Sequence, residues 1–428
     1  MPKLGTLGSL FAFMRGRKPD PASAAPPTDP ASGDATFATS LYQRLARQPG
    51  NLFFSPASVR MALGMTYAGA RGDTASEMRR ALALPPGKEA HDLFAAQLKR
   101  WDILANPVDA QPQGNLANDP EMRGYYADQL ERRRVTLRIV NRIWSQSGHP
   151  LSFEFLSLLA EAYRAPPAQL DFKTRAEPSR VAINEWVSEN TATKIPELIA
   201  RDLISADTRL VLTNAIYFKA RWSQQFRKEA TREQPFFVSA TEKVPVPMMR
   251  QVHHFHLGTF RDGQVLELSY GGGDLSMVIV LPSKVDGLPA IEAQLADGAL
   301  PEWLGSMKGV SADVSLPRFK VSTAFLLAEV LKGLGMGKPF TWPGADFSGI
   351  DGTKELVISE VVHQALVEVD ELGTEAAAAT AVVAMLTKST PREEKPVVFR
   401  ADRPFLFLIR EVKSGVLLFV GRLVRPGA

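Results

Sequence analysis

The segment from Glu371 to Lys388 constrains the fold of this chain more than any other part of its sequence. It reads ELGTEAAAATAVVAMLTK, with no glycine or proline after Gly373 and a single charge between Thr374 and Thr387. Surface loops are rich in Gly, Pro, Asn and Asp, and strands usually have about five or six residues, so the segment is typical of neither. We predict that it is first an exposed loop and later a long strand inside a sheet.

The alternation of side chains along a strand supports this interpretation. One face would be uncharged, because it would carry Thr374, Ala376, Ala378, Thr380, Val382, Ala384 and Leu386. The opposite face would carry Glu375, Ala377, Ala379, Ala381, Val383 and Met385. The one charge would therefore stay out of the core. An alanine-rich helix in the free loop is the alternative, since alanine is the best helix former, and it would not prevent later insertion.

The composition excludes several other classes of protein. Of the 428 residues, 45% are hydrophobic and 22% are charged, which is typical of a soluble globular protein. The formal net charge of +4 is too small to indicate a nucleic-acid-binding protein. There is no cysteine, so disulfides, cysteine nucleophiles and cysteine-bound zinc are excluded. No apolar run reaches about 18 residues, and we expect no membrane span.

The N-terminal residues 1–33 are expected to form an extension outside the fold. The apolar stretch Leu4–Met14 is followed by the basic run Arg15–Lys18, which is the wrong flank for a cleaved signal peptide. A proline-rich linker then follows, which cannot bury a core and should be extended or disordered. We therefore predict one domain over residues 34–428. The proline- and glycine-containing residues 105–134 are expected to be a surface insertion within it.

Helix signals gather in the first half of the chain and strand signals in the second, which predicts an α+β fold. Ser55 followed by Pro56 is typical of a helix start, and Ser179 could cap a second helix. Both faces of the segment Arg209–Lys219 are apolar, which is typical of a central strand covered on both sides. Further β-branched and aromatic segments predict strands at 275–281, 355–370, 405–410 and 415–424.

Several short motifs occur in a characteristic order between Asp34 and Pro426. They are NLFFSPAS (51–58), GARGDT (69–74), WVSENT (186–191) with KIP (194–196), LTNAIYFKARW (212–222), LPRFK (316–320), DRPFLF (402–407) and LFVGR (418–422). None is decisive alone. Together they resemble the serpin family, and the type they resemble is an inhibitory, prokaryotic-like serpin.

This resemblance implies a fold with three β-sheets, about nine helices and an exposed reactive-centre loop at about 371–398. It implies no enzymatic activity and no cofactor, but suicide inhibition of a serine protease by a monomer that traps it as a covalent acyl-enzyme. No nucleic acid or membrane span is implied. The location implied is extracellular or at the cell surface, or cytoplasmic if the N-terminus is not a signal. The alternative is a non-inhibitory serpin with a binding or chaperone-like role.

The resemblance also assigns residues to the moving parts of such a fold. It implies a breach residue, Trp222, at the point where the loop inserts. It implies a buried polar shutter under the sheet, made of Ser55, Ser58, Asn214 and His363. It implies a hinge made of Glu371, Gly373, Thr374, Glu375, Ala376, Ala377, Ala378, Ala379 and Thr380. Leu372 departs from the charged or polar residue expected at its position.

Counting from Gly373 at the interval usual in the family places the reactive bond between Thr387 and Lys388. A threonine before the bond suits a protease with a small apolar pocket, of elastase type. Leu386 would instead suit chymotrypsin- or subtilisin-like pockets, and Lys388 trypsin-like ones. The charged stretch 392–395 makes the loop longer than is common, so both alternatives remain open.

Three other motifs point to other functions. Gly333–Lys338 resembles a phosphate loop but lacks the Ser/Thr that should follow the lysine, so we expect a helix end with turn glycines there. His254 and His256 share a strand face and, with His253 and a carboxylate such as Glu267 or Asp262, would form at best a weak metal site, so we predict none. Arg132–Arg134 is expected to be a solvated basic run. No Gly-x-Ser-x-Gly motif is present to supply a hydrolase nucleophile.

Overall fold

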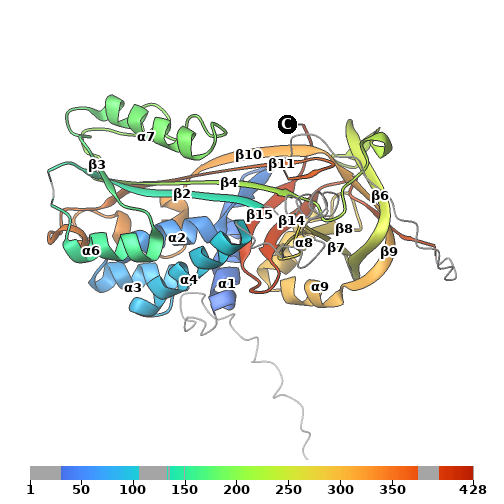
Figure 1. Ribbon diagram of the computed structural model, residues 1–428, viewed down its shortest axis with the longest axis horizontal. Helices are drawn as coiled ribbons and strands as arrows, with labels where there is room; N and C mark the ends of the chain where they lie inside the picture. Colours follow the sequence, from blue (N-terminus) through green and yellow to red (C-terminus); the bar gives the residue numbers. More distant parts are fainter. Residues whose placement is uncertain (1–29, 106–132, 134, 149, 375–394, 428) are drawn as a thin grey trace, which may run out of the picture.

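The protein has a long central sheet with a layer of helices on one face, a single helix on the other and a second sheet at one end (Figure 1). The computed structural model describes residues 30–105, 133, 135–148, 150–374 and 395–427. The architecture is α+β, as predicted. Within the described residues no helix is long and apolar enough to cross a membrane.

The central sheet has six strands in the order β10-β11-β12-β4-β2-β3. Three of them are 12 residues long, so the sheet runs across most of the molecule (Figure 1). The bounds are β2 Val135–Gln146, β3 Ala168–Leu170, β4 Leu210–Arg221, β10 Phe319–Leu326, β11 Ile358–Val369 and β12 Gly373–Thr374.

The second sheet has nine strands, and its longest strand, β6, pairs with three of the others. β6 has 18 residues and pairs with β5 near its start, with β9 along its middle and with β7 near its end. The hydrogen-bonded ladders of the described residues therefore form two sheets where three were expected. The bounds are β1 Leu52–Phe54, β5 Arg232–Phe237, β6 Lys243–Phe260, β7 Gly263–Ser269, β8 Leu275–Pro282, β9 Lys308–Pro317, β13 Val397–Arg400, β14 Phe405–Glu411 and β15 Leu417–Leu423.

Ten α-helices occur in the described ranges, close to the expected nine. Their bounds are α1 Pro30–Leu45, α2 Pro56–Tyr67, α3 Gly72–Ala81, α4 Lys88–Ala105, α6 Phe153–Leu158, α7 Ala176–Asn190, α8 Leu288–Ala296, α9 Leu300–Ser306, α10 Ala328–Gly333 and α11 Ser348–Asp351. Short 3₁₀ turns lie at Lys228–Ala230 and Lys338–Phe340, and α6 continues into a π-helical turn at Leu159–Tyr163.

One helix start agrees with the sequence-based expectation and one differs from it. Helix α1, described from Pro30, includes four residues before the domain start predicted at Asp34. The prediction that Ser179 caps a helix was wrong. Helix α7 begins at Ala176, and the Ser179 hydroxyl donates instead to the carbonyl oxygen of Asp171 at 3.1 Å. By contrast, Ser55 caps α2, accepting from the Ser58 N–H at 3.1 Å as expected.

The central sheet is buried on both faces near its middle, as the apolar sequence of β4 predicts. Ten of the 12 residues of β4 are buried, the exceptions being Lys219 and Arg221. One face, with Leu212 and Ile216, belongs to the large core that also includes the helical layer. The other face contributes Val211 to a smaller core beneath α7. β4 is therefore held between two apolar layers.

Candidate functional site: the seam between strands β4 and β11

The two central strands, β4 and β11, run parallel to each other although most of their neighbours are antiparallel. Their pairing runs from Ile358 opposite Leu210 to Leu366 opposite Tyr217, and we call this stretch the seam. On their outer sides, β4 pairs antiparallel with β2, and β11 pairs antiparallel with β10. A strand inserted into the seam in the opposite direction would therefore give both β4 and β11 a second antiparallel partner.

At one end of the seam such a strand has already begun. β12 lies between β4 and β11, with Gly373 opposite Arg221 and Thr374 opposite both Ala220 and Val369. Gly373 is required there because a Cβ atom would lie 2.1 Å from the carbonyl oxygen of Ala220. The remaining predicted hinge residues, Glu375 to Thr380, and the predicted reactive-bond residues Leu386, Thr387 and Lys388 lie outside the described residues.

Two stacked aromatic side chains hold this short strand in place. The Trp222 ring stacks on Tyr270 with centroids 4.6 Å apart. Trp222 donates from its backbone N–H to Leu372 O and from its indole Nε1 to Asp370 O, both at 2.9 Å. The Tyr270 hydroxyl lies 2.7 Å from Thr374 Oγ1. The predicted breach residue Trp222 thus contacts the chain that enters the sheet, and Tyr270 is a contact that the sequence did not suggest.

Glu371 is a buried carboxylate that anchors the turn before β12. The residue is 1% exposed, and its carboxylate accepts from Arg318 Nε at 2.8 Å and from the Thr231 hydroxyl at 2.5 Å. Burial raises the pKa of Glu371, but the hydrogen bonds from Arg318 and Thr231 outweigh it, so its pKa lies below the usual value. Because a charged, paired carboxylate is costly to separate from its partner, this contact opposes movement of the turn.

The neighbouring carboxylate of Asp370 closes the same turn. Its Oδ1 accepts from the backbone N–H groups of Leu372 at 2.8 Å and Gly373 at 3.1 Å. Burial raises the pKa of Asp370 despite these two hydrogen bonds. The turn is therefore held by the hydrogen bonds of Asp370 to its own backbone and by the contacts that Trp222 and Glu371 make with neighbouring segments.

The four predicted shutter residues meet under the middle of the seam, together with Asn141. The Nε2 atom of His363 accepts the Ser55 N–H at 3.1 Å, and His363 Nδ1 contacts Asn214 Oδ1. Asn214 Nδ2 donates to Ser58 Oγ at 2.7 Å and also contacts Asn141 Oδ1. All five side chains are buried. This polar cluster joins α2, β2, β4 and β11, so separating β4 from β11 must break some of its hydrogen bonds.

The imidazole of His363 is neutral within the polar cluster. Burial lowers its pKa to about 3, against a smaller raising effect of the contact with Asn214. Because Nε2 accepts a hydrogen bond, the proton resides on Nδ1 and is donated to Asn214.

Acidification is expected to destabilise the intact protein through His363. Its pKa is lower in the folded state, so its contribution is complete above the unfolded-state pKa and is lost as the pH falls from there toward 3. At pH 5 this amounts to about 2 kcal/mol relative to pH 7.5. Urea unfolding at the two pH values, for the wild type and His363→Gln, measures it. The variant should lose this part of the pH dependence, and an unchanged pH dependence would contradict the assignment.

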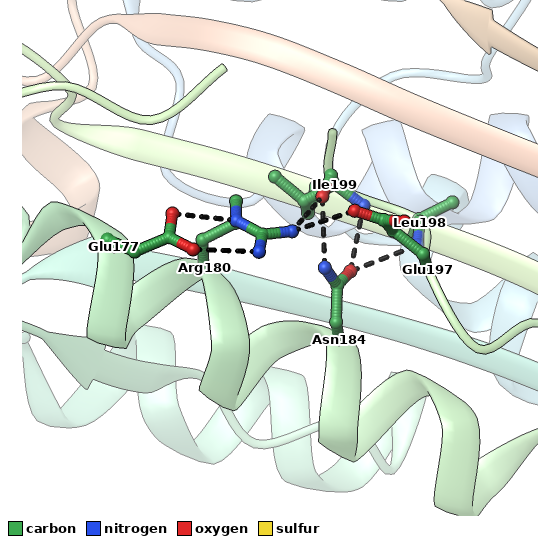
Figure 2. Close-up of polar contacts among 6 residues, drawn as sticks. All are labelled: Glu177, Arg180, Asn184, Glu197, Leu198 and Ile199. Atoms are coloured by element: carbon green, nitrogen blue, oxygen red, sulfur yellow. Dashed lines mark hydrogen bonds and ion pairs between the residues drawn. The ribbon is translucent and has the colours of Figure 1, made fainter. Parts of the chain in front are cut away.

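Helix α7 lies alone over the far face of the sheet and is fastened to the chain that follows it (Figures 1 and 2). Asn184 accepts at Oδ1 from two consecutive N–H groups of the segment 195–199, at 3.0 and 2.8 Å. Arg180 forms a two-point ion pair with Glu177 at 2.8 Å and a single contact with Glu197 at 2.9 Å. Figure 2 shows these side chains converging between the helix and the segment. We therefore expect helix α7 and the segment 195–199 to move together.

Helix α7 covers the seam. Ile183 and Val187 of α7 belong to one buried apolar cluster with Val211 of β4 and Val362 of β11. The helix thus packs on both strands that would have to separate. Opening the seam along its length requires α7 to shift, and the apolar burial resists that shift.

The far end of the loop is anchored in the other sheet. β13 pairs parallel with β9, with Val397 opposite Ala312 and Arg400 opposite Ser315. The chain between Thr374 and Val397 therefore connects two separate sheets.

The histidine and glycine motifs noted in the sequence do not form a binding site within the described residues. Within the described ranges no group of three His, Asp or Glu side chains is placed to hold a metal ion, and His256 Nδ1 lies 3.9 Å from Glu267 Oε2. Glu267 also accepts from Ser276 and Arg410. The glycines after Gly333 form a turn that ends α10, as expected.

Comparisons with known proteins agree with this geometry. A family model described as "Serpin (serine protease inhibitor)" matches residues 32–426. The chain is 40% identical over 406 residues to a leukocyte elastase inhibitor of Bos taurus, covering 92% of this chain and 99% of the relative. It is 38% identical over 394 residues to an uncharacterized serpin-like protein of Thermococcus kodakarensis, covering 91% and 84%.

Solved structures give the same answer. The crystal structure of Serpin48 from Tenebrio molitor has a TM-score of 0.78 at 29% identity, covering 92% of this chain and 97% of the other. Uncleaved ovalbumin has a TM-score of 0.76 at 28% identity, covering 92% and 99%.

Proposed function

Because this chain belongs to the serpin family, we propose that it inhibits a serine protease as a suicide substrate, through the loop between Thr374 and Val397. The observation that carries the proposal is the position of β12, which occupies one end of the seam between β4 and β11. The protein acts as a binding partner of the protease and not as an enzyme, and it needs no cofactor.

The chemistry begins with the protease. Its serine attacks the carbonyl carbon of Thr387, the amide bond to Lys388 breaks, and the new amino group leaves with the C-terminal part of the loop. The serine is then esterified to Thr387. A small residue before the bond, together with relatives named leukocyte elastase inhibitor, supports an elastase-type target. Cleavage after Leu386 or Lys388 remains the alternative.

The register of β12 supports a specific position for the freed loop. Thr374 pairs with Ala220, and each further loop residue would face one residue earlier in β4 and in β11. Six residues on, Thr380 would therefore lie between Asn214 and His363, at the polar cluster. Its hydroxyl can replace part of the hydrogen bonding that these two side chains give up when the strands separate.

The energy available is large enough to drive this change. An added strand gains on the order of ten backbone hydrogen bonds, which at roughly 1 kcal/mol net each is about 10 kcal/mol. That equals the whole stability of an ordinary domain, about 5–15 kcal/mol. The intact form is therefore kinetically trapped, and the barrier comes from the anchored turn at Glu371, the polar cluster and helix α7.

Insertion would inactivate the attached protease. The ester at Thr387 moves with the loop toward the opposite end of the sheet. The protease is then pulled against the body of the inhibitor, and small displacements from reactive geometry slow a reaction by orders of magnitude. Hydrolysis of the ester stalls, and the complex remains covalent.

Denaturing gel electrophoresis after mixing with elastase, subtilisin, chymotrypsin and trypsin tests the proposal. We expect a band at the summed mass of the N-terminal fragment and the protease, most intense with elastase. Mass spectrometry of the released C-terminal peptide identifies the bond that is cut. Cleavage by all four proteases without such a band would overturn the inhibitor and favour the non-inhibitory alternative, a binding or chaperone-like serpin.

A further inference from the structure

A large groove lies beside the start of the reactive loop. Its volume is about 900 Å³, and its walls are residues 223–230, residues of strand β5, residues 250–253 of strand β6, and Leu372. Leu372 directly precedes β12, and the Phe226 N–H donates to Glu371 O at 2.9 Å. The groove is therefore continuous with the turn from which the loop departs.

The groove is strongly basic. Arg227, Lys228, Arg232 and Arg250 line it, against the single carboxylate of Glu229. Arg250 is engaged, because it forms a two-point ion pair with Asp313 at 2.8 and 2.6 Å. The other three cations are exposed, and none has a carboxylate within ion-pair distance in the part of the chain that the structure describes.

These three cations lie on ordered backbone, and Arg232 also donates from its guanidinium to the carbonyl oxygen of Thr231 at 2.8 Å. Lys228 belongs to a 3₁₀ turn, in which the Ala230 N–H donates to Arg227 O at 3.0 Å. Arg232 opens strand β5, which pairs antiparallel with residues 243–248 of β6. Three positive charges without carboxylate partners, carried on fixed backbone, create a positive potential, and the backbone that carries them need not be ordered on binding.

The groove also lies on the sheet that holds the far end of the loop. β13, where the loop ends, pairs with β9, β9 pairs with β6, and β6 pairs with β5. The wall of the groove is thus joined by an unbroken ladder to one loop anchor, and Leu372 joins it to the other. The groove therefore borders both anchors of the loop that the proposed protease would hold.

We propose that this groove is a second contact surface for the target protease, and that it receives an acidic part of the protease surface outside the catalytic cleft. The inference rests on the proposed inhibitory function. An acidic protein surface fits better than a sulfated polysaccharide, because Val252, which is 52% exposed, adds an apolar contact to the same wall. The contact would speed encounter and select among proteases with similar primary pockets.

The test is a rate comparison in which total charge is controlled. The groove variant is Arg227→Ala/Lys228→Ala/Arg232→Ala. The control variant removes the same charge from three exposed lysines elsewhere, Lys99→Ala/Lys173→Ala/Lys338→Ala, none of which has an ion pair in the described structure. Second-order rate constants are measured with pancreatic elastase and with subtilisin, at about 50 mM and about 500 mM NaCl, with the stoichiometry of inhibition measured in parallel.

The comparison uses whichever of the two proteases the wild type inhibits faster. At low salt, we expect the second-order rate constant of the groove variant to be about tenfold lower than that of the wild type, and that of the control variant to change less than about twofold. The difference should vanish at high salt, and the stoichiometry should stay the same in all three proteins. Equal rates for both variants would overturn the groove. A groove variant that binds dextran sulfate less well but inhibits both proteases at the wild-type rate would also overturn it. Absence of covalent complex in the wild type would overturn the inhibitory function instead.

Discussion

Replacing Thr380 by arginine is expected to turn this protein from an inhibitor into a substrate. The register of β12 would bring position 380 between Asn214 and His363, in a layer where both side chains are fully buried. An unpaired guanidinium there costs about 4 kcal/mol, which slows insertion about 1,000-fold. Deacylation then wins, and the loop is cut without trapping the protease. The measurements are the stoichiometry of inhibition and the yield of covalent complex.

Ala377→Arg is the matched control, because it adds the same charge to the same segment on the opposite face. Position 377 would face Tyr217 and Leu366, on the side where Glu375 also lies in the inserted strand. This variant should still inhibit, with the stoichiometry changed less than about threefold. Tyr217 and Leu366 are 7% and 8% exposed and lie outside the apolar cluster beneath α7, so a long arginine side chain at this position can extend its guanidinium to solvent. If Thr380→Arg inhibits as well as the wild type, the assignment of the inward face is wrong.

Cleavage of the loop should raise the melting temperature of the protein. If the freed segment enters the seam, the gain of about 10 kcal/mol corresponds to a rise in Tm of more than about 10 °C for a domain of this size. Limited proteolysis by a protease that cuts the loop without being trapped gives the nicked form. Circular dichroism at increasing temperature, for intact and nicked protein, makes the comparison.

The nicked Thr380→Arg variant is the internal control for this experiment. Its loop is cut in the same way, but the charge disfavours the inserted position, so most of the rise in Tm should be lost. A nicked wild type that melts no higher than the intact protein would remove the basis of the mechanism, because the intact fold would then not be metastable.

The long strands were predictable from the sequence because their residues leave little choice. The segment predicted at 209–219 forms β4 (Leu210–Arg221), and the one predicted at 415–424 forms β15 (Leu417–Leu423). Both are nearly continuous apolar runs, which is the pattern of strands covered on both faces. The cap at Ser55 was predictable for a local reason, since a serine followed by proline suits the first helical turn.

The contacts that anchor the hinge were not predictable, because they join residues that are distant in sequence. Tyr270 is 104 residues from Thr374, and Arg318 is 53 residues from Glu371. Neither belongs to a local motif. The buried polar cluster was missed in part for the same reason. Asn141 carries no local signal, because β2 also contains other polar residues, among them Arg138, Arg142 and Gln146.

The helix cap assigned to Ser179 failed because two polar roles are alike in sequence. A serine near a helix start can accept from the first N–H groups or can donate to a preceding carbonyl, and only the tertiary position of Asp171 decides.

The register of β12 also predicts how many loop residues the seam could accommodate. If pairing continued from Thr374 to position 384, the loop would reach Leu210 at the end of the seam, ten residues or about 34 Å from where it began. Only positions 385–387 would then remain between the sheet and the ester, a linker of about 10 Å. So short a linker would hold the captured protease directly against the end of the sheet. How strongly the protease is distorted therefore depends on which bond of the loop is cut.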